Sequence, residues 1–215
     1  MTSMDPLDHS WIGEVLKEHG IACSRHMSSQ VSLYLKLLEK WNQKINLTGL
    51  KTSREMLVEL FAESFFAGKF LEESDMPIVD VGSGAGFPGM ALKIFNPQWR
   101  VYLLEPRQKR ATFLTFVKQE LGVIRTKVIC KTLEDCSAID FYEPPRTFTF
   151  RGLGRMADKL KHCSNLCSDQ GKVILFTTEN EWNKKLEYVE GIKWLKIVKI
   201  PWSHQKIVVT GVQTK

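Results

Sequence analysis

Two hydrophobic periods divide the chain. In residues 1–75 apolar side chains recur every three or four positions, as on one face of an amphipathic helix. The clearest run is Val31, Tyr34, Leu35, Leu38, Trp41 and Ile45. This spacing predicts a helix that ends near Asn46, and a capping box at Thr52 and Glu55 predicts the start of another. We therefore expect residues 1–75 to form a helical extension.

The period changes after Pro77. Short apolar runs now alternate with helical stretches, which predicts a parallel sheet that helices cover on both faces. The strands are expected at 78–81, 101–104, 127–130, 147–150, 173–176, 194–200 and 206–211. The last two have no helix between them and read as a hairpin, so the last strand should run antiparallel to its neighbour. The sequence predicts an α/β fold with a seven-stranded, mostly parallel sheet over residues 76–215.

Composition narrows the class of protein. The chain has 215 residues, of which 43% are hydrophobic and 25% charged. These values are ordinary for a globular protein and exclude a disordered or collagen-like chain. No apolar run approaches the ~18 residues that span a bilayer, and the first ten residues show no apolar signal segment. We expect a cytoplasmic protein without a membrane partner.

Charge is distributed unevenly. Residues 1–75 carry 8 basic and 11 acidic side chains, whereas residues 76–215 carry 22 basic and 13 acidic ones. The basic part suits a polyanionic partner such as RNA, and an ordinary basic surface is the alternative. The five cysteines are odd in number and contain no C-x-x-C, and the histidines form no ligand pattern. We therefore expect no metal.

The glycine-rich run Asp80-Val81-Gly82-Ser83-Gly84-Ala85-Gly86-Phe87-Pro88-Gly89 follows a predicted strand and precedes a helix. Such a turn brings bare backbone against a ligand at the carboxyl edge of the sheet. The spacing of Gly84, Gly86 and Gly89 also matches the dinucleotide fingerprint, but Asp80 would repel a diphosphate. S-adenosylmethionine has a cationic end and no phosphate, and Glu105 after the second strand could accept its ribose hydroxyls. These residues favour S-adenosylmethionine over a nicotinamide cofactor.

The loop 80–89, together with Trp41-Asn42-x-x-Ile45-Asn46-Leu47-Thr48 upstream, resembles the bacterial GidB/RsmG family. Members of that family are small-subunit (16S) ribosomal RNA guanine-N7 methyltransferases. The resemblance extends from about Val31 to Phe176. It implies a class I (Rossmann-like) methyltransferase fold with a helical extension, S-adenosyl-L-methionine as cofactor, and ribosomal RNA or the small ribosomal subunit as partner. By resemblance the cofactor contacts fall on Gly82, Phe87, Leu133, Glu134 and Arg151.

Departures from the family pattern concern the acceptor side, including the segment after the fourth strand, where the family has S-R-A-x-A and only the arginine, Arg151, is kept. The family has H-x-x-D-S where this chain has Leu60-Phe61-Ala62-Glu63-Ser64, and a Lys-Gly pair where it has Thr177-Thr178. Three functions therefore stay open. They are N7 methylation of a guanosine in small-subunit ribosomal RNA, methylation of a small molecule, and RNA binding with reduced turnover.

The predicted chemistry needs no general base, because guanine N7 carries a free lone pair. The task is to align the methyl group and the base. Arg151 ends the fourth strand at the expected site and is our candidate for positioning the acceptor. Glu63 is a weaker candidate for stabilising the charge that develops on the purine. Arg107, Lys109 and Arg110, at the start of the helix after Glu105, are our candidates for RNA binding.

Overall fold

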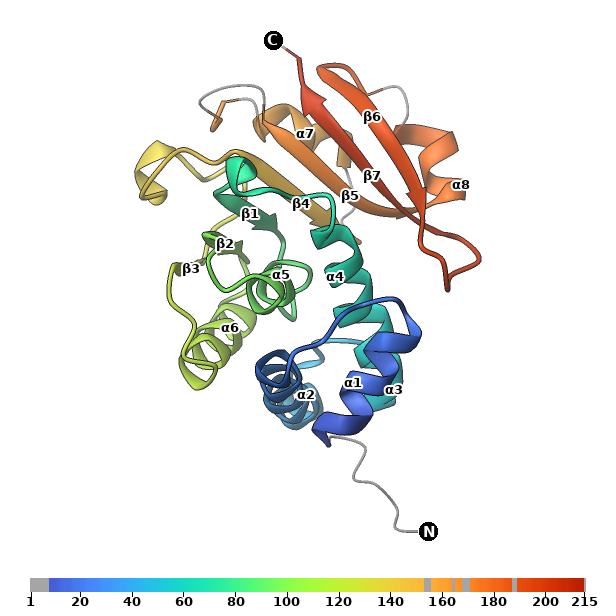
Figure 1. Ribbon diagram of the computed structural model, residues 1–215. Coiled ribbons are helices and arrows are strands. Elements are labelled where there is room, and N and C mark those ends of the chain that lie inside the picture. The colour runs from blue at the N-terminus through green and yellow to red at the C-terminus, as the bar shows by residue number, and fades with distance from the viewer. Residues whose placement is uncertain (1–7, 153–155, 164, 168–170, 187–188, 215) are drawn as a thin grey trace.

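The computed structural model describes residues 8–152, 156–163, 165–167, 171–186 and 189–214. It contains a seven-stranded sheet in the order β3-β2-β1-β4-β5-β7-β6, with helices on both faces (Figure 1). The strands are β1 Ile78–Val81, β2 Val101–Leu104, β3 Thr126–Ile129, β4 Thr147–Arg151, β5 Lys172–Thr178, β6 Ile192–Lys199 and β7 Lys206–Gln213. The five neighbouring strands β3, β2, β1, β4 and β5 run parallel to one another, and β7 is antiparallel to both β5 and β6. The predicted fold class is therefore confirmed.

The helices keep the predicted order along the chain. They are α1 His9–Glu18, α2 Arg25–Ile45, α3 Ser53–Met56, the π-helical η1 Leu57–Ala62, α4 Glu63–Gly68, α5 Gly89–Phe95, α6 Gln108–Glu120, α7 Met156–Cys163, α8 Glu179–Glu181 and the π-helical η4 Trp182–Leu186, with short 3₁₀ turns η2 Glu73–Asp75 and η3 Ala138–Asp140. The capping box at Thr52 and Glu55 is confirmed, since the Thr52 side chain accepts the Glu55 N–H and the Glu55 side chain accepts the Thr52 N–H. Together α3, η1 and α4 make one continuous helical segment.

Several strand boundaries differ from those predicted by one or two residues, and two differences have an identifiable physical reason or consequence. β5 continues through Thr178 because β7 pairs with it along its whole length, from Lys172 opposite Val212 to Thr178 opposite Lys206. The helical segment after Thr52 contains the wider turns of η1, which the apolar spacing did not predict. A π-helical turn inserts one residue per turn and is frequent at functional sites.

Alternation along the strands sends neighbouring side chains to opposite faces of the sheet. Residues such as Ile78, Leu103 and Phe176 pack against the helices before β1 and against α5 and α6. On the other face, residues such as Val79, Phe150 and Leu175 pack with α7 and η4. The first core thus joins the helical extension to the sheet, and the division into units 1–75 and 76–215 stays a prediction.

β1 is the point at which the strand order reverses, because β2 lies on one side of it and β4 on the other. In open parallel sheets, ligands bind beyond the carboxyl ends of the strands at such a point. The glycine loop leaves β1 here and enters α5. Within the ranges described above, no helix is both long enough and apolar enough to cross a bilayer.

Candidate active site

Asp80 holds the two ends of the glycine loop together. Its Oδ2 accepts the backbone N–H of Gly89 at 2.9 Å, where α5 begins. Its Oδ1 accepts the hydroxyl of Thr149 at 3.0 Å, and Thr149 lies opposite Asp80 in the register of β1 and β4. A Cβ on Gly89 would lie 2.6 Å from the Asp80 Cβ, so only glycine permits this approach. Whether the carboxylate also contacts a ligand stays a prediction.

Burial sets the protonation of Asp80. The side chain is almost fully buried, and desolvation raises its pKa from the ordinary value of 3.8 to about 6. Hydrogen bonds from Gly89, Ser83 and Thr149, and the charge of Arg151, oppose that rise. At neutral pH the group is a carboxylate that accepts two hydrogen bonds, and it takes up a proton near pH 6.

Glu105 connects the end of β2 to the same loop. It is buried, its Oε2 accepts the N–H of Gly84 at 2.8 Å, and its Oε1 accepts the N–H of Arg107 at 2.9 Å. A carboxylate has about four lone-pair sites, so acceptor capacity remains for a ligand.

A cavity of about 190 Å³, which we call the donor cavity, opens beside Glu105. Three residues predicted to bind the cofactor line it, namely Gly82, Glu105 and Leu133. Whole small-molecule sites measure roughly 300–1,000 Å³, so this cavity suits the nucleoside part of a donor. The carboxylate, the apolar walls and the bare backbone of Gly82 fit an adenosine group. Lys131, Thr132 and Lys159 also line the cavity, and none of them was predicted as a site residue.

The other predicted cofactor residues are not among those that line this cavity. Glu134 forms an ion pair with the lining residue Lys159 at 3.6 Å. Phe87 is buried and stacks on Tyr34, with ring centroids 5.3 Å apart, and it is not among the lining residues. Their contacts with a cofactor stay predictions.

Helix α2 contacts the glycine loop and the turn that follows the helix. The buried hydroxyl of Tyr34 donates a hydrogen bond to the carbonyl of Ala85 at 2.5 Å. The Asn42 Oδ1 accepts the N–H groups of Leu47 and Thr48 at 2.6 and 2.9 Å, which fixes the turn after α2. In that turn the carbonyl of Asn46 accepts from Arg110 Nη2 at 3.1 Å. The upstream motif thus positions a side chain of the donor cavity.

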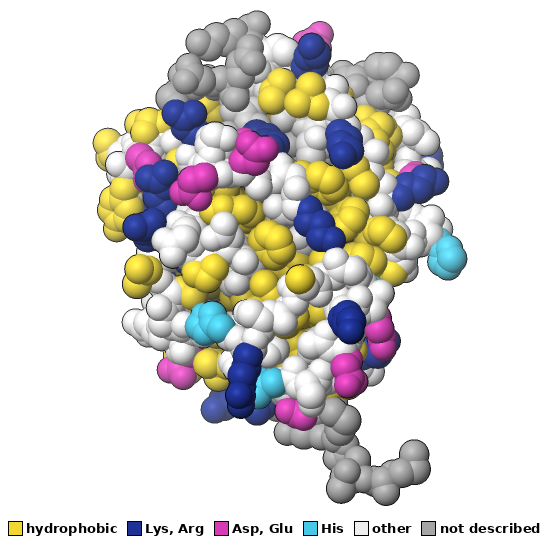
Figure 2. Space-filling view, in the orientation of Figure 1, with side chains coloured by type: hydrophobic (Ala, Val, Ile, Leu, Met, Phe, Trp, Pro, Cys, Tyr) yellow, Lys and Arg dark blue, Asp and Glu magenta, His cyan; other side chains and the backbone are white. Residues whose placement is uncertain are grey.

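The three basic residues predicted to bind RNA are divided between two environments. Arg107 and Arg110 line the donor cavity, whereas Lys109 is exposed and does not. On the face that Figure 2 shows, basic and acidic side chains alternate with apolar ones and form no single basic patch. The role of these residues in RNA binding stays a prediction.

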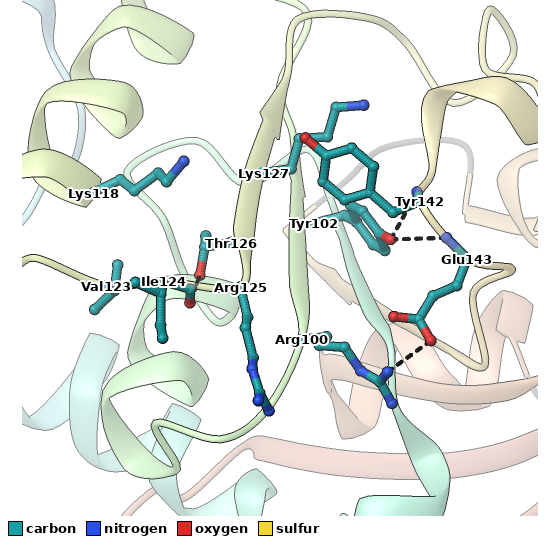
Figure 3. A pocket seen from close by; sticks show the side chains of 10 residues that line it. All are labelled: Arg100, Tyr102, Lys118, Val123, Ile124, Arg125, Thr126, Lys127, Tyr142 and Glu143. Atoms are coloured by element: carbon teal, nitrogen blue, oxygen red, sulfur yellow. Dashed lines mark hydrogen bonds and ion pairs between the residues drawn. The ribbon is translucent and has the colours of Figure 1, made fainter.

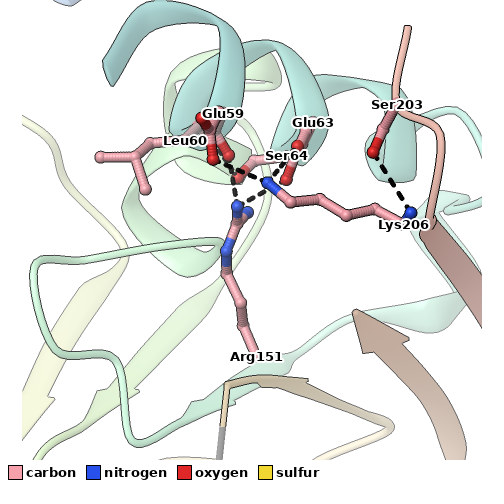
Figure 4. Close-up of polar contacts among 7 residues, drawn as sticks. All are labelled: Glu59, Leu60, Glu63, Ser64, Arg151, Ser203 and Lys206. Carbon is pink, nitrogen blue, oxygen red and sulfur yellow. Dashed lines mark hydrogen bonds and ion pairs between the residues drawn. The ribbon is translucent and has the colours of Figure 1, made fainter. Parts of the chain in front are cut away.

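Arg151 lies in a cluster of charged residues at the end of β4 (Figure 4). Its Nη2 donates to Glu63 Oε2 at 2.6 Å and to the carbonyl of Glu59, which the π-helical segment presents. The guanidinium also lies over the ring of Phe176, 5.2 Å from the centroid, opposite Arg151 in register. Its Nη1 is buried and has no hydrogen-bond partner among the described residues.

Lys206 completes this cluster from β7. Its Nζ lies 2.8 Å from Glu59 Oε2 and 2.9 Å from Glu63 Oε1, so Glu63 is held between two cations. Lys206 pairs in register with Thr178, one of the two residues that stand in place of the family's Lys-Gly pair. Thr178 itself caps α8 by accepting the N–H of Glu181. The cluster therefore receives its second cation from the neighbouring strand, which the sequence pattern did not indicate.

In the described part of the chain, His, Cys, Asp and Glu side chains nowhere gather as a group of three or more that could hold an ion.

Comparison with known proteins identifies the family. Residues 27–206 match the family model GidB, described as rRNA small subunit methyltransferase G. The Ribosomal RNA small subunit methyltransferase G of Staphylococcus aureus (strain JH9) is 31% identical over 166 residues, which cover 76% of this chain and 69% of that protein. Its namesake from Staphylococcus haemolyticus (strain JCSC1435) is 30% identical over 165 residues, with the same coverage.

Solved structures share the fold at low identity. A SAM-dependent methyltransferase from Aquifex aeolicus superposes with a TM-score of 0.55 at 17% identity, covering 74% of this chain and 93% of that one. P. horikoshii TYW2 in complex with MeSAdo superposes with a TM-score of 0.57 at 11% sequence identity. The superposition covers 72% of this chain and 63% of that one. The sheet order, the glycine loop and the match over residues 27–206 agree, and the chain belongs to the rRNA small subunit methyltransferase G family.

Proposed function

We propose that this protein transfers the methyl group of S-adenosylmethionine to N7 of a guanosine in small-subunit ribosomal RNA, in the cytoplasm. Membership of the family supports the reaction and the RNA substrate. The observation that carries the proposal is the position of buried Glu105, which lines the donor cavity and fixes the glycine loop through Gly84.

Glu105 and the glycine loop would hold the donor. The Glu105 carboxylate accepts hydrogen bonds from ribose hydroxyls, and Leu133 offers an apolar wall to the adenine. When bound, S-adenosylmethionine supplies an electrophilic methyl group on a sulfonium. Asp80 keeps the loop closed through Gly89 and Thr149, so the backbone is already shaped for the ligand.

Arg151 would orient the acceptor base. Guanine presents O6 and N7 as acceptors on one edge, and Arg151 Nη1 is a buried donor without a described partner. A hydrogen bond from Nη1 to O6 would fix the base while N7 stays free to react. The guanidinium carries hydrogen-bond donors and no acceptor, so Arg151 positions the base and does not act as a general base.

Glu63 has a supporting role in this arrangement. Its two oxygens bind Arg151 and Lys206, and the side chain is only 3% exposed. Guanine N7 has no proton to remove, so the reaction requires no base from Glu63. Glu63 therefore holds Arg151 in place.

A methylation assay tests the proposed function. Purified protein is incubated with labelled S-adenosylmethionine and either small ribosomal subunits or naked ribosomal RNA that lack the modification, and the nucleosides are then analysed. Label in 7-methylguanosine is the expected result. Label on another nucleoside, or transfer only to small molecules, would contradict the proposal. RNA binding without any transfer would instead favour the binding protein without turnover.

The substitution Glu105→Ala is expected to weaken donor binding. It removes the acceptor for the ribose hydroxyls and for the Gly84 N–H, at a cost of ~1–3 kcal/mol. Calorimetry should show S-adenosylmethionine affinity reduced about 5- to 150-fold. Exposed Lys109→Ala, outside the cavity, is the control and should bind like the wild type. Unchanged affinity in Glu105→Ala, or tighter binding of NAD than of S-adenosylmethionine, would overturn the cofactor assignment.

Donor affinity is expected to fall as pH falls through 6. Protonation of Asp80, whose pKa is about 6, removes an acceptor from the loop, and affinity should drop at most about tenfold per pH unit. Because the folded-state pKa lies above 3.8, ionised Asp80 costs stability above pH 6, and that cost disappears on acidification. Unfolding through this group therefore does not explain the loss.

Titration calorimetry from pH 8 to 5.5 measures this dependence. Asp80→Asn keeps an acceptor for Gly89 but does not titrate, so its affinity should be lower and independent of pH over that range. A wild-type affinity that is flat from pH 7 to 5.5 would show that the loop does not depend on the ionised carboxylate.

A further inference from the structure

A second cavity, of about 660 Å³, lies near the amino ends of β2 and β3 (Figure 3). Two of its lining residues, Arg100 and Arg125, directly precede β2 and β3, whereas Glu105 follows the carboxyl end of β2. Arg100 and Glu105 are five positions apart in the chain, which is about 16 Å along an extended strand. The two cavities share no lining residue.

This cavity carries an excess of positive charge. Arg100 forms an ion pair with Glu143 at 2.8 Å, which neutralises the carboxylate in the lining. The remaining cations are Lys118, Arg125 and Lys127, and none of them has a carboxylate partner among the described residues. Lys127 Nζ donates to the backbone carbonyl of Asp140, and Arg125 Nη1 donates to that of Gln98. Three uncompensated cations around one hollow attract a polyanion.

An aromatic ring projects beside these cations. Tyr142 is 83% exposed, and Lys127 Nζ lies 4.6 Å from its ring centroid. The backbone at Tyr142 and Glu143 is held in place, because the buried Tyr102 Oη accepts their N–H groups at 3.0 and 3.3 Å. An exposed ring on a fixed backbone, next to basic side chains, is the arrangement on which unpaired bases stack.

Basic residues can also serve to protect the edge of a sheet, but that role does not account for all the cations and the tyrosine of this cavity. β3 is the edge strand, and lysines on edge strands prevent pairing with other chains. That accounts for Lys127, but Lys118 comes from α6 and Tyr142 from the loop before β4 (Figure 3). Arg125 also has a positive φ of 56°, an unfavourable conformation for a residue with a side chain. Such strain is frequent at functional sites.

We propose that this cavity is a second contact site for the RNA substrate, separate from the methylation site. An unpaired base stacks on Tyr142, and flanking phosphates bind Lys118, Arg125 and Lys127. The inference rests on the proposed function and adds a place where the protein binds RNA at a distance from the reacting guanosine.

Two charge-matched triple variants test the proposal. The first combines Lys118→Gln, Arg125→Gln and Lys127→Gln. The control combines Lys36→Gln, Lys40→Gln and Lys44→Gln on the exposed side of α2, so net charge falls equally in both. Each protein is titrated with naked small-subunit ribosomal RNA and with unmodified small subunits over a range of salt concentrations. Methylation, S-adenosylmethionine affinity and thermal melting are measured in parallel.

The first triple variant is expected to bind naked RNA at least tenfold more weakly than the control. Its log–log salt slope should be lower by about 2, at ~0.7 per phosphate contact. KM for RNA should rise, while kcat, donor affinity and melting temperature stay unchanged. Tyr142→Leu should weaken binding about tenfold and leave the salt slope unchanged, because stacking involves no counterion release.

Equal RNA affinity and slope in the two triple variants would overturn the proposal. Weaker binding to subunits with unchanged binding to naked RNA would also overturn it, and would indicate a ribosomal protein in the cavity. If the wild type methylates ribosomal RNA in those experiments, only the second contact site fails. If the wild type neither binds nor methylates RNA, the proposed function fails as well.

Discussion

Gly86→Ala is expected to abolish donor binding and to destabilise the fold. A Cβ at this position would lie 2.0 Å from Tyr34 Oη, and the residue has a φ of 91°. Tyr34 cannot move aside, because it is buried, bonds to Ala85 and stacks on Phe87. Overpacking costs ~1–3 kcal/mol and the backbone conformation ~1–2 kcal/mol. The sum is a large part of the ~5–15 kcal/mol that stabilises a typical domain.

Thermal melting and titration with S-adenosylmethionine measure both effects. Gly13→Ala in α1 is the matched control, because no heavy atom lies within 4 Å of its added Cβ and its φ is not positive. Adding Tyr34→Phe to Gly86→Ala removes the clashing oxygen and should restore part of the stability. A Gly86→Ala protein that melts and binds donor like the wild type would show that the loop does not need this approach between helix and backbone.

Arg151→Ala is expected to lower methyl transfer about a hundredfold, the usual cost of removing one donor that acts at the reacting group. The fold should survive, since Glu63 keeps its ion pair with Lys206 at 2.9 Å. Arg151→Lys should restore only part of the rate, because an ammonium lacks the planar fork that reaches Glu63, Glu59 and the base together.

Single-turnover methylation, with a thermal melt of each variant, separates the two roles of Arg151. Lys206→Met is the comparison, since it removes the other cation that contacts Glu63 and leaves the Arg151 contact in place. It should retain more activity than Arg151→Ala. If Arg151→Ala transfers methyl groups at the wild-type rate, the residue does not position the acceptor. If it unfolds, its role is structural.

The apolar pattern of the sequence correctly predicted the features that depend on short segments of the chain. Short apolar runs correctly identified the strands, and the absence of a helix between the last two identified the antiparallel end of the sheet. The glycine loop and Glu105 were expected together because both follow parallel strands. β1 and β2 are neighbours with matched ends, Val81 opposite Leu104, so their carboxyl ends meet at one edge.

Contacts between distant segments could not be predicted in this way. Arg151 and Glu63 are 88 positions apart, and Lys206 and Glu63 are 143 apart. These contacts depend on the strand order, on the register of β5 with β7 and on the π-helical segment. None of these produces a periodic pattern of apolar residues in the sequence. Lys159 lines the donor cavity although no sequence motif marks it, because the position of α7 over the sheet depends on contacts between segments that are distant in the chain.

The hydrogen bond from Tyr34 to Ala85 has a consequence for the thermodynamics of binding. A flexible glycine loop loses conformational entropy when a ligand orders it, and that loss weakens affinity. Here α2, Asp80 and Glu105 already restrain the loop from three directions. The entropy is therefore lost during folding, when burial of the shared core compensates it, and donor binding begins from a preorganised backbone. Residues of the helical extension, far from the donor in sequence, thus contribute to its affinity.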